Sequence, residues 1–193
     1  MDYAARVRGC EAACDSAKDN KSSVGCDYYS VDPGTDGEAN GSCFAAYIAN
    51  TWDTAATLSV TYNGQTLNLA GLARIPSGTG NNITYSPLPG GVLPPGKMAI
   101  LFLADFNTSV PLPTRCPSGV TAGYTASEAS SQTTAIIHAF HITSSVPVVA
   151  YDIFPYGGAK SYISSATLLL PSSSWDTNYI AVRCPTAQGG GGI

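Results

Sequence analysis

The chain has 193 residues, of which 44% are hydrophobic and only 11% charged, and its net charge is −4. Residues 1–38 hold eight of the 13 acidic and four of the nine basic side chains, so the rest of the chain is electrically neutral. A neutral body without a Lys/Arg stripe argues against binding to nucleic acid or to anionic membranes. The length fits one hydrophobic core, and the longest apolar run, residues 98–104, is too short to span a bilayer.

The first 41 residues differ from the rest and are predicted to form an acidic, Cys-rich head. Residues 10–19 predict a short helix, the only one expected, with Cys10 and Cys14 on one face at spacing i, i+4. Residues 27–41 are rich in Asp and Gly and predict turns that separate the head from the body. No signal-peptide core is found in residues 1–26, so we expect Met1 to be a cut into a longer precursor.

The body, residues 42–184, is predicted to be an antiparallel β-sandwich of about nine strands, because β-formers recur between turn signals. The predicted strands are residues 43–49, 57–62, 65–69, 82–85, 97–103, 134–143, 147–153, 162–170 and 178–182. Asn63-Gly64 predicts a tight hairpin, since a type I′ turn requires positive φ at both central residues. The Pro-rich segments 86–96 and 109–119 predict rigid surface loops. The Gly-rich residues 185–193 predict a tail or linker.

Six cysteines in a chain poor in charge and rich in Ser and Thr predict disulfides and an exported protein. The candidates are Cys10, Cys14, Cys26, Cys43, Cys116 and Cys184. Sequence cannot choose among the fifteen possible pairings. Their spacing lacks the paired short knuckles of structural zinc sites, so no metal is expected there.

Four aromatic residues are candidate binding residues. Trp52 and Trp175 stand in a repeated Trp-Asp-Thr sequence and are either structural covers at strand ends or ligand platforms. Phe154 and Tyr156 flank Pro155 before Gly157-Gly158, where they are either contact residues on an exposed loop or parts of a long hairpin connection.

No catalytic motif is found, and no cofactor is expected. The two histidines, His138 and His141, fall in one predicted strand and point to opposite faces by the period of two, so they do not form a metal pair. His138 is expected in the core, and His141 on the surface or in the core. Asp32, Asp36 and Glu38 surround a Gly turn; a solvated turn is favoured over a calcium loop, because the EF-hand spacing is missing.

Several stretches resemble the IgGFc-binding protein N-terminal domain family, with the bacterial, myxobacterial-type branch as the nearest. They are SSVGCDYYSVD (22–32), CFAAYIANTWDTAATLSVTYNGQTL (43–67), RIPSGTG with NITYSPL, LPPGKMAILFL, HAFHITSSVPVVAYDIFPYGG and SATLLLPSSSWDTNYIAV. The resemblance covers about residues 22–183. It implies a β-rich extracellular domain of a large, Cys-rich surface or mucus-associated protein without known catalytic activity. Fc binding, known for animal members, need not extend to a bacterial-type copy.

The sequence therefore predicts a noncatalytic extracellular or cell-surface recognition or adhesion module. It would bind a protein or glycan and be flanked by further domains of the same polypeptide. Two alternatives stay open: a carbohydrate-binding accessory domain or carbohydrate-active enzyme, with Trp52, Trp175 and Tyr156 as platforms, and a structural spacer domain.

Overall fold

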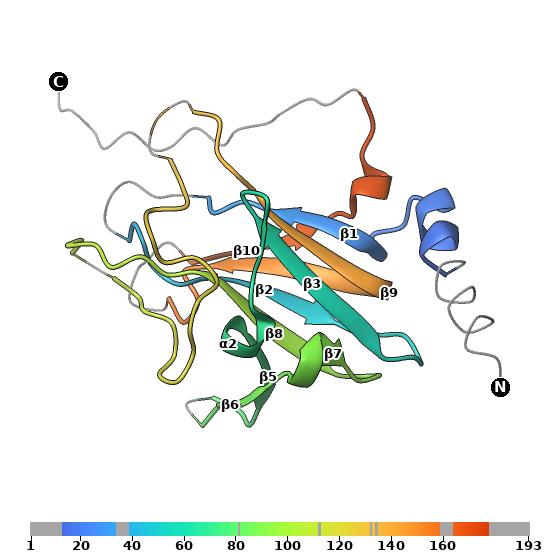
Figure 1. Cartoon of the computed structure of the whole chain (residues 1–193), viewed down its shortest axis with the longest axis horizontal. Coiled ribbons are helices and arrows are strands. Elements are labelled where there is room, and N and C mark those ends of the chain that lie inside the picture. The colour runs from blue at the N-terminus through green and yellow to red at the C-terminus, as the bar shows by residue number, and fades with distance from the viewer. Residues whose placement is uncertain are drawn as a thin grey trace, which may run out of the picture.

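The computed structural model describes residues 13–33, 39–80, 82–111, 113–131, 133, 135–158 and 164–177. Within these ranges the chain forms a curled antiparallel sheet (Figure 1). Its strands are β1 (Gly25–Ser30), β2 (Phe44–Ala49), β3 (Ala56–Tyr62), β4 (Gln65–Thr66), β5 (Ala73–Ser77), β6 (Thr84–Pro87), β7 (Val92–Leu93), β8 (Met98–Ala104), β9 (Phe140–Phe154) and β10 (Ser165–Leu169). The helical pieces are residues 13–19, α2 (Leu69–Leu72), η1 (Pro89–Gly91) and η2 (Ser172–Ser174). The predicted all-β antiparallel fold is confirmed.

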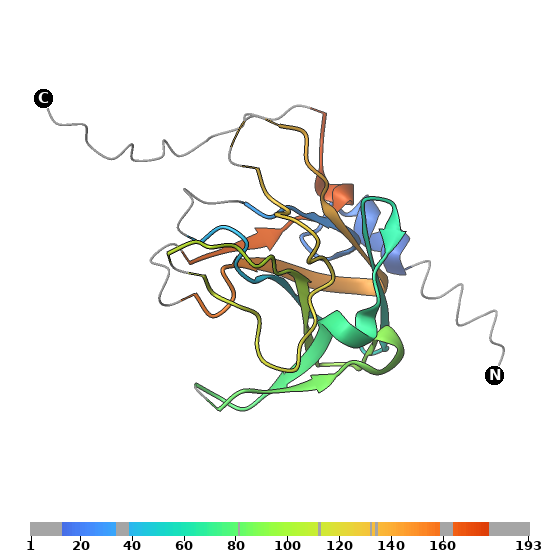
Figure 2. The same ribbon diagram turned by 60° about the vertical axis from the view of Figure 1, so that its left-hand side comes forward.

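The long strand β9 organises the sheet, because its two halves pair with different neighbours. Its first half pairs with β1 and β3, and its second half with β2 and β10. The main path runs β4-β3-β9-β2-β8-β5-β6. Ser145 and Pro147 lie near the change of partners, where a proline costs no ladder hydrogen bond. A strand that changes partners along its length lets the sheet curl around its own core, and the view of Figure 2 shows this curl.

The inner face of the curl holds the main hydrophobic core. Alternate residues of β2, β3 and β9 point into it, in keeping with the period of two. Fully buried side chains include Tyr28, Phe44, Ile48, Leu101, Phe140 and Ile142. The other face of β2 and β8 is buried as well, by a second cluster that contains Ala45, Phe102 and Tyr156. Burial on both faces explains why residues 100–104 are continuously apolar.

Two disulfides join segments outside the regular sheet to strands of the core. Cys14–Cys26 ties the helical residues 13–19 to β1, and Cys43–Cys116 ties the start of β2 to the second Pro-rich loop. The prediction of disulfides is confirmed for these four residues. Cys10 and Cys184 lie outside the described residues, as do the predicted strand 178–182 and the tail 185–193.

Local predictions near the turns have mixed outcomes. The Asn63-Gly64 hairpin is confirmed, with φ of 48° and 74° and with Tyr62 paired to Gln65. The predicted strand 65–69 is wrong after Thr66, because Asn68 caps α2 by accepting a hydrogen bond from the Ala70 N–H. The predicted strand 82–85 lies at Thr84–Pro87 instead.

Three further expectations need correction. Residues 27–30 are not turns but most of β1, which pairs with β9 and so joins the sheet of the body. Strands 134–143 and 147–153 are one strand that begins at Phe140. The expectation of a single helix missed α2, and β5 was not predicted, because its Arg74 and Pro76 hide the strand pattern.

Candidate recognition surface

Strand β1 places polar and aromatic side chains on the outer face of the sheet. Tyr28 and Ser30 are fully buried, so the alternate residues Asp27 and Tyr29 point outward. The Tyr28 hydroxyl accepts a hydrogen bond from the Gly25 N–H and donates to the Val148 carbonyl, and burial raises its pKa to about 12. Tyr28 therefore locks β1 against β9 from the inside while its neighbours face solvent.

Three rings form a continuous row on this outer face, named here the aromatic row: His141, Tyr29 and Trp175. Tyr29 pairs with His141 across β1 and β9, and their rings stack 4.5 Å apart at 8°. Trp175 lies against Tyr29 with 5.6 Å between ring centroids and a tilt of 44°. Tyr29 and Trp175 remain 38% and 46% exposed. The row is therefore ordered by its own contacts yet accessible to a partner.

Asp27 fixes one end of the row. Its Oδ1 lies 3.2 Å from His141 Nε2, and both side chains are partly exposed. Residues on the same face of neighbouring strands at a diagonal position are within reach of each other, so β1 supplies both the carboxylate and the ring that hold His141. This pair orients His141 and keeps a carboxylate at the surface beside the row.

Trp175 is fixed at the other end by backbone and side-chain hydrogen bonds. Its N–H closes η2 on the Ser172 carbonyl, and its indole N–H donates to the Leu170 carbonyl at 3.2 Å. The hydroxyl of Ser174 donates to the Ser22 carbonyl at 2.6 Å, which ties this turn to the segment before β1. The indole N–H is thus already satisfied, and the ring offers its apolar surface rather than a donor.

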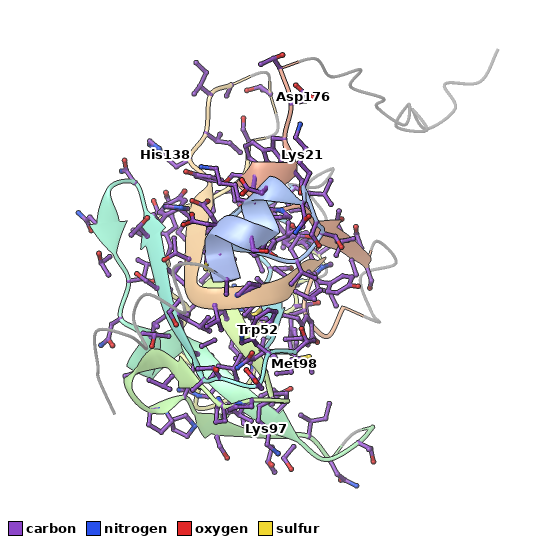
Figure 3. The ribbon with its side chains drawn as sticks, turned by 90° about the vertical axis from the view of Figure 1, so that its right-hand side faces the viewer. Lys21, Trp52, Lys97, Met98, His138 and Asp176 are labelled. Carbon is purple, nitrogen blue, oxygen red and sulfur yellow. A yellow bond between two sulfur atoms is a disulfide. The ribbon has the colours of Figure 1, made fainter. Side chains whose placement is uncertain are left out.

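The residue that follows Trp175 forms an exposed ion pair. Lys21 Nζ and Asp176 Oδ2 lie 3.6 Å apart and are 63% and 68% exposed, so the pair is bathed in solvent. The Thr177 N–H, followed by the charge of Lys21, lowers the pKa of Asp176. Figure 3 shows both residues at one side of the helical residues 13–19. The surface next to the row thus carries an acceptor and a donor that both reach water.

A hollow of about 260 Å³ is bounded by the helical residues 13–19, by Cys26 and Asp27 of β1 and by Ser172 and Ser173 of η2. The Cys14–Cys26 disulfide forms part of its wall, together with Lys18, Asp27 and Ser172. Because the disulfide holds the helical residues 13–19 beside β1, it also maintains this hollow. The hollow is therefore lined by charged groups of both signs, Asp15, Lys18 and Asp27.

The structure separates the two tryptophans that the repeated sequence suggested as platforms. Trp52 is 41% exposed, and its N–H donates to Asn50 Oδ1 at 3.0 Å. Trp52 lines a second hollow, whose other lining residues are mainly small or apolar side chains such as Val24 and Pro147. Figure 3 shows Trp52 on the opposite side of the helical residues 13–19 from Asp176. Only Trp175 joins the aromatic row.

Phe154 and Tyr156 are not exposed contact residues, which corrects that interpretation. Phe154 is 3% exposed and Tyr156 7%, and the Tyr156 hydroxyl lies 2.8 Å from that of Tyr85. Burial, and then the hydrogen bond with Tyr85, raise the pKa of Tyr156 above its ordinary value. Phe102 packs edge-on against Tyr156 at 5.0 Å. The loop folds inward because this face of β2 and β8 has its own apolar cluster to complete.

One of the two histidines differs from expectation. His138 is exposed and precedes β9, so its expected place in the core is wrong. His141 is partly buried in the aromatic row. Asp32, which was considered as part of a solvated turn or a calcium loop, is only 3% exposed. Asp36 and Glu38 lie outside the described residues. Among the described residues, no group of three or more His, Cys, Asp or Glu side chains is placed to hold a metal ion.

Sequence reasoning missed Asp27, Tyr29 and His141 as members of one surface. The usable signal was the pair Tyr28-Tyr29, since tyrosines favour a strand in which neighbouring side chains point to opposite faces. It was obscured because the Asp- and Gly-rich residues that follow predict turns. The cross-strand partner in β9 lies more than one hundred residues away, at a distance that no local pattern spans.

Comparison with known proteins adds no relative. No family model matches the chain, and neither the search of curated proteins nor that of solved structures gave a significant match. In the described part of the chain, no helix has the length and apolar character needed to cross a membrane.

Proposed function

We propose that this chain is a noncatalytic extracellular recognition module that binds its partner through the aromatic row. The observation that carries the proposal is the row itself: Tyr29 packs against both His141 and Trp175, and Tyr29 and Trp175 are 38% and 46% exposed. Large exposed rings that rigid neighbours hold in place are the usual energetic centres of binding surfaces. The disulfide beside the row supports an oxidising compartment.

The row suits recognition because its geometry is set before a partner arrives. Tyr29 and His141 sit on paired strands, and the indole N–H of Trp175 is bonded to the backbone. Side chains that are already ordered lose little conformational entropy on binding. The resemblance to the IgGFc-binding N-terminal domain family supports the same class of function, as one domain of a larger surface or secreted protein with a protein or glycan partner.

The proposal assigns the His141–Asp27 pair to positioning rather than to proton transfer. His141 stacks on Tyr29 while it bonds to Asp27, so the pair completes the row. Turnover of ester or glycoside substrates by the wild-type protein that disappears in His141→Ala would contradict this assignment.

A binding screen tests the proposal. Immobilised wild-type protein is exposed to a glycan array and to a panel of extracellular proteins that includes antibody Fc. We expect Tyr29→Ala and Trp175→Ala each to weaken the detected binding by about tenfold or more, as the loss of a central aromatic contact does. Trp52→Ala is the matched control and should leave it within about twofold. If no ligand binds, or if the row variants bind as well as wild type, the chain is not a recognition module of this kind and a spacer role is favoured.

A further inference from the structure

We propose that Trp175 is the stacking platform of a carbohydrate site for an uncharged pyranose residue, with Asp176 and Lys21 as its hydroxyl partners. The inference rests on the proposed function and names the ligand class of the same surface. It depends on what surrounds Trp175 on each side, since an exposed tryptophan alone does not make a site.

The indole ring is backed by Tyr29 and remains partly exposed. Tyr29 contacts it at 5.6 Å, and the bond to the Leu170 carbonyl fixes its orientation, yet 46% of the residue remains exposed. A pyranose ring presents a patch of C–H groups on one face and hydroxyls around its rim. A flat aromatic surface with no unsatisfied donor matches the C–H patch and costs no desolvation of a polar group.

The hydroxyl rim needs charged or polar partners near the platform, and the residue that follows Trp175 forms such a charged pair. Asp176 follows Trp175 directly, and Lys21 lies 3.6 Å from its carboxylate. A carboxylate accepts and an ammonium donates strong hydrogen bonds to hydroxyl groups. Because an ion pair so exposed contributes little stability, a sugar hydroxyl can insert between the two groups at small cost.

The charges around the site favour an uncharged sugar over an acidic one. The neighbouring hollow is lined by Asp15 and Asp27 with Lys18 as its one cation among the lining residues, and Lys21 is already paired with Asp176. There is no excess of positive charge here to attract a uronate, a sialate or a sulfated sugar. The same hollow offers Ser172 and Ser173 to a second sugar unit.

Trp52 provides an internal control, since it has the same Trp-Asp-Thr sequence and a similar exposure of 41%. Its surroundings differ: no ring among the described residues is seen packed against it, whereas Tyr29 packs against Trp175, and the ion pair with Lys21 is made by Asp176. The hollow beside it is lined by Ala13, Ala17, Val24 and Pro147 among others. The inference therefore predicts that the two tryptophans respond differently to sugars.

The chain contains only these two tryptophans, so each can be observed alone. Trp52→Phe leaves Trp175 as the sole indole, and Trp175→Phe leaves Trp52. Each protein is titrated with cellotriose, maltotriose and triacetylchitotriose, with trigalacturonic acid as the acidic comparison, while tryptophan fluorescence is recorded. We expect at least one uncharged trisaccharide to change the fluorescence of Trp52→Phe saturably, and none to change that of Trp175→Phe.

Calorimetry then measures the affinity of the best trisaccharide. Trp175→Ala should weaken it by at least about tenfold, and Asp176→Asn by several-fold, whereas Trp52→Ala should leave it unchanged. Far-ultraviolet circular dichroism and the melting temperature establish that Trp175→Ala is folded. If that variant is unfolded, the fluorescence of Trp52→Phe alone decides.

Each outcome has a definite meaning. Sugar binding that survives Trp175→Ala, or binding of trigalacturonic acid alone, overturns the inference. If no sugar binds but a protein ligand still depends on Tyr29 and Trp175, the carbohydrate site is wrong and the proposed recognition function stands. If neither sugars nor proteins depend on the row, both proposals fail.

Discussion

The molecule contains two aromatic clusters that resemble each other in composition and differ in position. One is the aromatic row of His141, Tyr29 and Trp175 on the outer face of β1 and β9. The other comprises Tyr85, Tyr156 and Phe102, with Tyr47 beside them, under the loop that Cys116 anchors. The first has rings that are 38% and 46% exposed, whereas in the second Tyr156 and Phe102 are 7% and 0% exposed.

The difference shows that exposure and partner type, rather than residue type, decide what a tyrosine does. In the buried cluster the hydroxyls of Tyr85 and Tyr156 bond to each other, so their polar atoms are used within the protein. In the aromatic row, Tyr29 stacks on His141 and lies tilted against Trp175, while Tyr29 and Trp175 stay partly exposed to water. The buried cluster should therefore govern stability, and the exposed row should govern binding.

Among these substitutions, Phe102→Ala in the buried cluster is expected to lower the free energy of unfolding most. Removing a fully buried ring should lower the free energy of unfolding by about 3–5 kcal/mol, through lost burial and the cavity left behind. Trp175→Ala removes a larger but exposed ring and should cost only about 1 kcal/mol, the value of its contact with Tyr29. Urea denaturation of both variants measures the contrast. Equal losses would show that the aromatic row is a structural element.

Removing the disulfide beside the buried cluster should cost more stability than removing the disulfide beside the aromatic row. Cys43–Cys116 closes 73 residues beside the buried cluster, and replacing both by Ala should cost about 4 kcal/mol if the unfolded chain gains the corresponding entropy. Cys14–Cys26 closes only 12 residues, and its double replacement should cost about 3 kcal/mol. The second change should also release the helical residues 13–19 from β1 and weaken ligand binding. Thermal denaturation under non-reducing conditions compares the two. A greater loss for the shorter loop would contradict the order.

A smaller effect is expected when only a hydroxyl is removed. Tyr156→Phe should lower the free energy of unfolding by about 1 kcal/mol, because the Tyr85 hydroxyl loses its partner in a partly dehydrated site. Tyr29→Phe, on an exposed ring, should stay within about 0.5 kcal/mol of wild type. Denaturant midpoints resolve this difference, and a cost for Tyr29→Phe as large as for Tyr156→Phe would place Tyr29 with the structural residues.

How much of this could be foreseen from the sequence depends on the range of the contacts. The β2, β3 and β8 strands and the Asn63-Gly64 hairpin were predictable, because alternation and turn chemistry act over a few residues. The continuity of β9 was not, since Ser144, Ser145 and Pro147 favour a break and only pairing with four other strands keeps the segment extended.

The site was less predictable than the fold. Trp175 could be named as a candidate from its Trp-Asp-Thr sequence. Tyr156 was misplaced, because Gly157-Gly158 indicates an exposed tip and gives no sign of the apolar cluster that draws the loop inward. Tyr29 and His141 meet only through the register of β1 and β9. Such a register depends on the whole sheet, so no window of the sequence contains it.

The smallest expected effect concerns two carboxyl groups, Asp152 and Asp176, whose pKa values shift in opposite directions. Burial raises the pKa of Asp152, even though the Ser30 and Thr167 hydrogen bonds act against it, whereas the Thr177 N–H and Lys21 lower the pKa of Asp176. A group whose pKa is higher in the folded state takes up a proton on folding, so stability rises as the pH falls from neutrality through that pKa. A lowered pKa has the opposite effect: the stabilisation is present above the ordinary Asp pKa and is lost on further acidification.

Relative to Asp152→Asn, the wild-type protein should therefore gain stability between pH 7 and pH 4, roughly the region above the ordinary Asp pKa. Relative to Asp176→Asn, it should lose stability below that region. Urea midpoints across this range measure both differences, and a wild-type protein that weakens relative to Asp152→Asn on mild acidification would show that the hydrogen bonds of Asp152 outweigh its burial.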